Sequence, residues 1–343
     1  MNSKNGNAHS NSPWQFVTGL VLASFIGLCT AFVLMRFLGE WEAVHQFSIG
    51  VTEGVTAWRA WQNRLLSPYI LLVVQQFGME GAWASKILTY VGIVLGVVCS
   101  YFTVFAAIGR MRSALAATLV FAGFYLFLQD RALFLWDTLD VLFFTIFSYL
   151  IVFERKLRWL IPITLLATSN RESGLFMALY IIISGFDVSQ LHRLRIRVSD
   201  RVRIATGGAI LFVGVIYTKL SRDLLFVQTI GGIEDEQHQF IGNHLQLIRN
   251  LRDLFKNNWT SEHILHSILI FFVLAYLAIR YVHMSAHLQN VTLFTLIMFG
   301  GTITFGVANE PRIFLSIMPI VFFIFLHEDG AVSEHRVTAG SEE

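Results

Sequence analysis

Long apolar runs alternate with short polar and charged segments along most of this chain. A helix that crosses a bilayer needs about 20 mostly apolar residues, and several runs approach or exceed that length. The expected helical runs are 14–38, 83–108, 113–129, 134–154, 159–167, 175–185, 203–220, 264–281, 288–307 and 313–326. The pattern therefore predicts an all-α fold, a polytopic transmembrane helical bundle with about nine spans.

The two ends of the chain differ from this apolar body. Residues 1–13 are polar and rich in Asn and Ser, and residues 327–343 are polar, so we expect disordered tails there. The run 14–38 is too long for the apolar core of a signal peptide and lacks a clear small-residue cleavage site, so we expect a retained helix. The sequence thus predicts a single transmembrane domain over residues 14–326.

Two stretches have the spacing of amphipathic helices that lie in the membrane interface. Trp58, Trp61 and Leu65 recur at helical spacing beside arginines, and the apolar run that follows them is too short to cross. In the loop 221–262, apolar residues recur at helical spacing from 247 to 255, opposite polar residues. We expect both helices on the outer face of the membrane.

Composition excludes an ordinary soluble domain. Mean hydropathy is +0.60 and only 14% of the residues are charged, as is typical of a membrane protein. The net charge of +2 gives no indication of nucleic-acid binding, and we expect none. Cys29 and Cys99 lie inside apolar runs, which indicates neither a disulfide framework nor a metal site.

The basic loops predict the orientation of the chain. When the N-terminus is cytoplasmic and residues 59–76 do not cross, the basic segments all fall on the cytoplasmic side, as the positive-inside rule requires. These segments lie around Arg110, Arg155, 193–203 and Arg280. A full span at 59–76 would place them outside, so we reject it. We expect an integral protein of a bacterial inner membrane.

The outer face receives the polar residues that interrupt the apolar pattern. They are Glu40, Glu42, Asp137, Asp140, Asn170-Arg171-Glu172, the acidic trio 234–236 and the segment 309–312. Ionised side chains near a membrane are costly, so they are normally paired or face a polar cavity. Two interpretations of the 168–174 stretch stay open: a structural Arg171–Glu172 pair that ties helix ends together, or part of a functional site.

The carboxylates of this face suit proton transfer or cation binding. Glu40, Glu42 and Asp137 are candidates for a catalytic general base, because a carboxylate can take the proton of an attacking hydroxyl. Asp137 and Asp140 lie three residues apart at a helix start and hence on one face. Their oxygens could also hold a divalent cation, which is the one cofactor that we consider.

The arginines of the same face suit an anionic substrate. Arg171 and Arg312 can grip a phosphate with two parallel hydrogen bonds, for which guanidinium is better shaped than ammonium. Glu172 and Glu310 could orient these arginines. The candidate substrate-binding residues are Asn170, Arg171, Glu172, Glu310, Arg312 and Arg64. Arginines and carboxylates at a membrane surface suit a lipid-linked phosphate.

Four short motifs resemble, in this order, those of a group of bacterial multispanning proteins, and that group is similar to the GT-C glycosyltransferase superfamily. They are Arg64-Leu65-Leu66-Ser67-Pro68-Tyr69, Trp136-Asp137-Thr138-Leu139-Asp140, Asn170-Arg171-Glu172-Ser173 and Glu310-Pro311-Arg312-Ile313-Phe314-Leu315. The resemblance implies a polyprenyl-phosphate-linked sugar as donor, used at the outer membrane face. It also implies that Glu40 or Glu42 matches the position of the catalytic acidic residue. The chain departs from the family pattern because Glu-Trp-Glu stands in place of paired aspartates.

These observations leave four functions open. The leading hypothesis is transfer of a sugar from a polyprenyl-phosphate donor to an envelope glycan, lipid or protein. A glycan polymerase or ligase would also join lipid-linked sugars at the outer face. A lipid-linked-sugar flippase and a structural membrane subunit are the non-enzymatic alternatives. A flippase should show polar residues through the depth of the bilayer, whereas these spans are almost wholly apolar at mid-depth.

Overall fold

A computed structural model describes most of the chain. The described residues are 13–54, 64–128, 133–154, 157–189, 191, 195–225, 247–248, 250, 261–305 and 311–327. Glu310, the acidic trio 234–236, most of the two expected interfacial helices and nearly all of the two expected tails lie outside these ranges.

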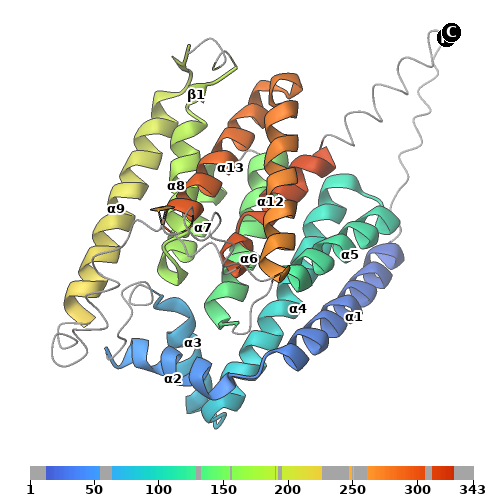
Figure 1. Cartoon of the computed structure of the whole chain (residues 1–343), viewed down its shortest axis with the longest axis vertical. Coiled ribbons are helices and arrows are strands. Elements are labelled where there is room, and N and C mark those ends of the chain that lie inside the picture. The colour runs from blue at the N-terminus through green and yellow to red at the C-terminus, as the bar shows by residue number, and fades with distance from the viewer. Residues whose placement is uncertain are drawn as a thin grey trace.

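The described chain is an all-α bundle, as the apolar pattern predicts (Figure 1). Its long helices are α1 (Pro13–Phe37), α4 (Gly81–Ile108), α6 (Leu135–Tyr149, continued by the π-helix Leu150–Glu154), α9 (Arg201–Leu225), α12 (Ser261–Arg280) and α13 (Ala286–Phe305). Its shorter helices are α2 (Trp41–Thr52), α3 (Leu66–Gln76), α5 (Met111–Phe127), α7 (Leu157–Asn170), α8 (Gly174–Ile183), the last helix Met318–His327, and the 3-10 turns Tyr281–His283 and Pro311–Phe314. A two-residue antiparallel pair joins β1 (Phe186–Asp187) to β2 (Arg197–Val198).

Five of the described helices are long and apolar enough to cross a membrane, fewer than the nine or so spans expected. They are α1, α4, α6 with its π-helical extension, α9 and α13. The other apolar runs form shorter helices that pack within the same bundle, such as α5 against α1 and α4. The apolar runs thus located the helices, but fewer of them reach spanning length.

Close packing of helices explains how the bundle holds together. In hydrocarbon, helix association depends on van der Waals packing, which small residues allow by letting backbones approach. Gly92 of α4 lies against Thr138 of α6, and Gly207 of α9 lies against the α8 backbone, where an added Cβ would come 2.7 Å from Ile182 N. Aromatic side chains fill the centre: the ring centroids of Phe147 and Tyr180 are 5.6 Å apart.

The outside of the bundle is apolar. Large hydrophobic side chains are exposed on α1 and on α9; Phe25 is 63% exposed and Phe212 is 67% exposed. A soluble monomer rarely leaves such a contiguous apolar surface open to water. The exposed apolar belt and the five long helices therefore define a helical membrane protein.

Up-and-down helices give the bundle two different ends. At the end that we call the polar end, Leu65 N–H donates to Ser169 O (3.1 Å), and Asn170 Nδ2 donates to Trp136 O (2.8 Å). These bonds join the starts of α3 and α6 to the end of α7. At the other end, Asn290 Nδ2 of α13 donates to Phe186 O of β1 (3.0 Å). Figure 1 shows α2 and α3 at one end of the bundle and β1 at the other.

Residues 41–52 form α2, a helix that is not among the expected helical runs. The helix buries Val44, His45, Ser48 and Val51 on one face. This spacing is helical, but two of the four side chains are polar, so the face was not visible as an apolar stripe. In the second expected interfacial helix, Asn250 lies on the predicted polar side, yet it is buried and donates to the α13 backbone.

Candidate functional site

The first turn of α6 fixes the position of Asp137. Phe134 N–H, at the helix start, donates to Asp137 Oδ2 at 3.2 Å, as in a capping box. A carboxylate there also interacts favourably with the positive end of the helix dipole. The Asp137 side chain is therefore held in place by its own helix before any other segment contacts it.

Two arginines from distant parts of the chain meet at this carboxylate. Arg171 Nη1 lies 3.0 Å from Asp137 Oδ1 and 3.8 Å from Asp140 Oδ2. Arg312 Nη1 lies 3.7 Å from Asp137 Oδ2. The aspartates share one face of α6, as their spacing predicts, and both are almost fully buried, whereas the arginine side chains are 17% and 13% exposed. The structure thus brings Asp137, Arg171 and Arg312 together at the polar end.

The turn between α7 and α8 docks on the same helix start. Ser173 Oγ donates to Asp140, lying 2.8 and 2.9 Å from its two carboxylate oxygens. Asn170 donates to Trp136 O, as noted above, and is fully buried. Ser173 was not among the predicted site residues; its place directly after Asn170-Arg171-Glu172, at the start of α8, is the signal that could have indicated it.

Two stacked aromatic rings lie beside Arg64 and Arg312. Phe134 and Trp136 stack with ring centroids 4.3 Å apart and planes 11° apart. The guanidinium carbon of Arg64 lies 4.9 Å from the Trp136 ring centroid, and that of Arg312 lies 5.4 Å from the Phe134 ring centroid. Each guanidinium is thus placed over an aromatic face, an arrangement that is attractive for a cation. Neither ring was among the predicted site residues.

Arg64 is a buried cation. Its guanidinium has no ion pair within the described residues, and its Nε is buried without a hydrogen-bond partner there. Burial lowers the pKa of Arg64 well below its ordinary value, to about 9; the positive charge of Arg171 lowers it further, and the negative charge of Asp137 opposes the shift. A buried charge without a counter-ion is costly, so this position favours an anionic ligand.

The cluster brings three guanidinium groups together. Arg64, Arg171 and Arg312 gather around the carboxylates of Asp137 and Asp140. Guanidinium groups bind phosphate and carboxylate strongly, particularly where water is partly excluded. The arrangement can therefore hold an anion at the polar end. We refer to these five residues as the arginine cluster.

Glu172 does not orient Arg171, contrary to the prediction. Its carboxylate forms an ion pair with Arg222 near the end of α9, while Arg171 turns to the aspartates. Adjacent residues in a turn point in different directions, so sequence neighbours need not be ion-pair partners. The brace that ties helix ends together therefore exists, but Glu172 makes it with Arg222.

Glu40 and Glu42 lie at the polar end but outside the arginine cluster. Both are exposed, and Glu42 accepts a hydrogen bond from Gln46 Nε2 at 3.0 Å. Within the described residues neither carboxylate contacts an arginine of the cluster. Their helix nevertheless lies beside it, because Trp41 and Val44 of α2 pack against Phe134 and Trp136. Asp137 differs from both, since Phe134 N–H and Arg171 already occupy its oxygens.

The described residues contain no group of three or more His, Cys, Asp or Glu side chains that could hold a metal ion. Arg171 lies within 4 Å of both Asp137 and Asp140, and Ser173 donates to Asp140. The positive group that these two carboxylates face is thus a guanidinium. The arrangement accounts for the aspartate pair without a divalent cation.

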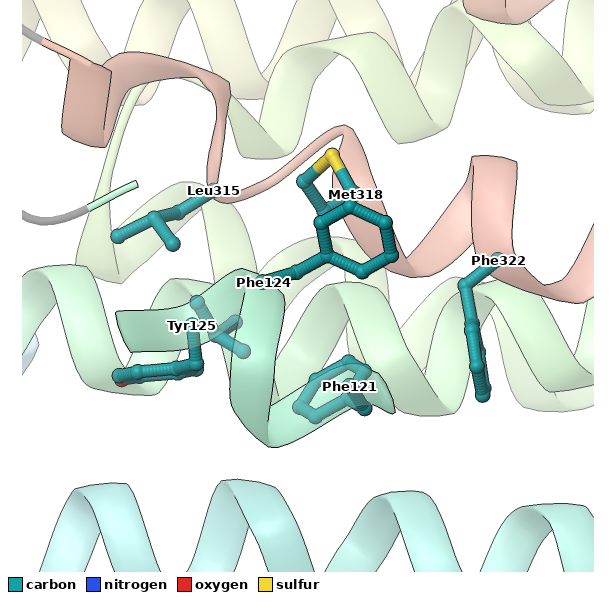
Figure 2. A pocket seen from close by; sticks show the side chains of 7 residues that line it. Phe121, Phe124, Tyr125, Leu315, Met318 and Phe322 are labelled. Carbon is teal, nitrogen blue, oxygen red and sulfur yellow. The ribbon is translucent and has the colours of Figure 1, made fainter. Parts of the chain in front are cut away.

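An apolar cavity of about 10 Å³ lies near the cluster, between α5, α6 and the last helix (Figure 2). Its lining residues are Phe121, Phe124, Tyr125, Val141, Leu315, Met318 and Phe322. Val141 follows Asp137 by one helical turn, and Leu315 follows Arg312 by three residues. The arginine cluster is thus bordered by apolar side chains toward the interior of the bundle.

No family model matches this chain, and no curated protein and no solved structure matches it. The fold and the site therefore define a class by themselves: a helical membrane protein with a buried, arginine-rich cluster at one end of its bundle.

Proposed function

We propose that this protein is a membrane glycosyltransferase that transfers a sugar from a polyprenyl-phosphate-linked donor to an envelope glycan, lipid or protein acceptor. The observation that carries the proposal is Arg64, a buried cation whose guanidinium has no carboxylate partner within the described residues, beside Arg171 and Arg312. Such a group favours an anion. A lipid phosphate is an anion that the membrane itself delivers to the end of a helix bundle.

The position of the cluster supports a lipid-linked substrate. Arg171 and Arg312 are each partly exposed, so a ligand can reach them, whereas Asp137 and Asp140 are almost fully buried. A phosphate at the interface would contact the guanidinium groups, and its polyprenyl chain would stay in hydrocarbon along the apolar surface of the bundle. Membrane lipid is thus the second partner of the protein.

In the proposed reaction, Glu40 or Glu42 takes the proton of an acceptor hydroxyl. The hydroxyl oxygen then attacks the anomeric carbon of the sugar, and the bond between that carbon and the phosphate oxygen breaks. Polyprenyl phosphate leaves with the electron pair, and its negative charge is stabilised by the arginine cluster. Asp137 has the role of an anchor for Arg171 and Arg312, because donors already occupy its oxygens.

The proposed orientation places the polar end outside a bacterial inner membrane and the N-terminus in the cytoplasm. The β1–β2 hairpin and the turns after α4 and α12 then lie inside. These segments carry Arg110, Arg112, Arg195, Arg197, Arg201, Arg203 and Arg280. An excess of arginine on cytoplasmic loops is the charge distribution that sets membrane orientation.

The alternatives differ in what they require of the cluster. A polymerase or ligase would use the same phosphate contacts and differ only in its acceptor. A flippase needs polar groups through the bilayer, yet the buried ionised side chains of the described residues, Arg64, Asp137 and Asp140, all belong to the polar end. A structural subunit would tolerate conservative changes of the arginines.

Substitution of Arg171 by Lys tests the proposal. Lys keeps one charge for Asp137 but loses the planar fork that binds phosphate, so Arg171→Lys should lower sugar transfer by roughly ten- to a hundred-fold, the equivalent of ~1.5–3 kcal/mol. The measurement is transfer of a labelled sugar from polyprenyl phosphate in membranes with matched protein levels. Arg203→Lys is the control, since Arg203 pairs with Asp200 at the other end. Normal transfer by Arg171→Lys and by Arg312→Lys would contradict the phosphate site.

A further inference from the structure

We propose that one buried water molecule joins α3 to α4, beside α2 at the polar end, and is bound by the hydroxyl groups of Ser67, Ser85 and Thr89. The inference rests on a small polar cavity between these helices and does not depend on the proposed function. Its residues are Val44, Ser48, Ser67, Leu71, Ser85, Thr89 and Leu135.

The size of the cavity selects the ligand. Its volume is about 10 Å³. A single water molecule needs a cavity of roughly 10–15 Å³ by this measure, together with two to four polar partners. A sugar, a phosphate or a lipid chain is far larger. Water is therefore the ligand that both the volume and the lining allow.

Two of the hydroxyl groups lack a partner within the described residues. Ser67 is 2% exposed and Thr89 is 0% exposed, and the side-chain oxygen of each is buried without a hydrogen bond there. Most buried Ser and Thr hydroxyls of this bundle instead donate to a carbonyl of the preceding turn; Thr103, also on α4, donates to Cys99 O and Ser100 O. A buried hydroxyl without a partner is costly, which favours a water that serves both.

A third partner and a fourth residue complete the site. Ser85 Oγ lies 3.0 Å from His45 Nδ1, so α2 and α4 are already connected there. Ser48 Oγ donates to Val44 O at 2.8 Å and keeps lone pairs with which it can accept. A water bonded to Ser67, Ser85 and Thr89 makes about three hydrogen bonds, the usual number for a buried water.

The bound water would fix the start of α3. Ser67 is in the first turn of this helix, three residues after Arg64, whose neighbour Leu65 donates to Ser169 O. Bonds from Ser67 through water to α4 therefore hold the segment that carries Arg64. The water site acts as a structural link beneath the arginine cluster.

The isosteric change Thr89→Val distinguishes a hydrated cavity from a dry one by the sign of the change in Tm. If water is bound, the change removes one of its partners, and the Tm of the purified full-length protein in detergent should fall by about 1–3 °C. If the cavity is dry, the change removes an unsatisfied hydroxyl, and the Tm should stay or rise. Thr103→Val, on the same helix but away from the cavity, is the matched control.

The double variant tests whether one water serves both hydroxyls. Ser67→Ala should lower the Tm in the wild-type background but much less in the Thr89→Val background, because the shared water is already lost there. Additive losses, or an unchanged or higher Tm for Thr89→Val, would overturn the proposal.

Radiolytic hydroxyl-radical labelling of the wild-type protein gives an answer that needs no variant to fold. Leu71 lines the cavity, and Leu34 of α1 does not, although both are 2% exposed. Radicals formed from a bound water should modify Leu71 well above Leu34. Equal labelling of the two leucines would contradict a bound water.

Discussion

At the scale of single residues, the polar end depends on Asp137. Its carboxylate accepts from the start of its own helix and pairs with Arg171 and Arg312, which lie far apart in the sequence. Asp140 supports the same arrangement through Ser173 and Arg171. Asp137 is thus the common ion-pair partner of both arginines.

Substitution of Asp137 by Asn should destabilise the protein strongly. Asn keeps the size and an oxygen for the helix cap but removes the charge that Arg171 and Arg312 face. Removal of one partner from a buried ion pair costs roughly 3–5 kcal/mol. Thermal unfolding in detergent measures the effect. Glu172→Gln is the control, because Glu172 is 41% exposed and such pairs are worth about 0–1 kcal/mol. Equal losses of Tm in the two variants would contradict the anchoring role.

The pKa of Arg64 predicts a pH dependence of function. With a folded-state pKa of about 9, Arg64 is charged at pH 8 and mostly neutral at pH 10. Its contribution to anion binding is therefore present below pH 9 and lost above it. We expect sugar transfer to fall by up to roughly ten- to a hundred-fold over this range, as for loss of a charge-assisted hydrogen bond.

Stability should change in the opposite direction. Because the pKa of Arg64 is lower in the folded protein than in the unfolded chain, the unfolded chain binds more protons above pH 9. The contribution of Arg64 to the free energy of unfolding therefore rises with pH there. The predicted pH dependence of sugar transfer is tested by initial rates of transfer at pH 8 and 10, for the wild type and for Arg64→Met. An equal decline of the transfer rate in both proteins would show that Arg64 does not cause the pH dependence.

At the scale of helices, the contacts between α8 and α9 depend on the absence of a side chain at one position. Gly207 lies against the α8 backbone, where an added Cβ would come 2.7 Å from Ile182 N and 3.0 Å from Ala178 O. Gly208, the next residue, has no atom within 4 Å of its Cβ position. Of these two neighbouring glycines, only Gly207 is at a position where an added side chain would meet the neighbouring helix.

This difference predicts opposite effects of alanine. Gly207→Ala should separate α8 from α9 and lower stability by about 1–3 kcal/mol, as overpacking does. Gly208→Ala should be neutral or stabilise by up to about 1 kcal/mol, because alanine favours the helix. Thermal unfolding of the two variants in the same detergent is the test. Equal effects would mean that the close approach at Gly207 does not limit packing.

At the scale of the whole molecule, the alternating helices separate a polar end from a basic end. Met79, between α3 and α4, is exposed at the polar end, and Ser199, next to β2, is exposed at the other. In a protein without Cys29 and Cys99, Met79→Cys should react with an impermeant thiol reagent from outside the cell. Ser199→Cys should react only after the membrane is opened. Labelling of both from one side would contradict the topology.

The sequence by itself determined the class of fold and the gathering of polar groups. Apolar length located the helices, and the alternation of their directions follows from the short connections between them. The Asp137–Asp140 spacing placed both carboxylates on one face of α6. Arg171 and Arg312 were predicted at the same end because each follows an apolar run that crosses toward the outer face when the N-terminus is cytoplasmic. Helix position, the shared face of two residues and the end of the bundle on which a residue lies can be predicted from the periodicity of the sequence and the direction of each helix.

Only the tertiary structure decided which charges pair and which are buried. It pairs Arg171 with Asp137 and Glu172 with Arg222, it places Arg64 over Trp136, and it leaves Glu40 exposed. These outcomes depend on contacts between segments more than thirty residues apart, about which helical spacing carries no information. Among the described helices, five reach spanning length, against the nine or so spans expected. Burial and ion pairing are properties of the assembled bundle, because they depend on which helices lie side by side.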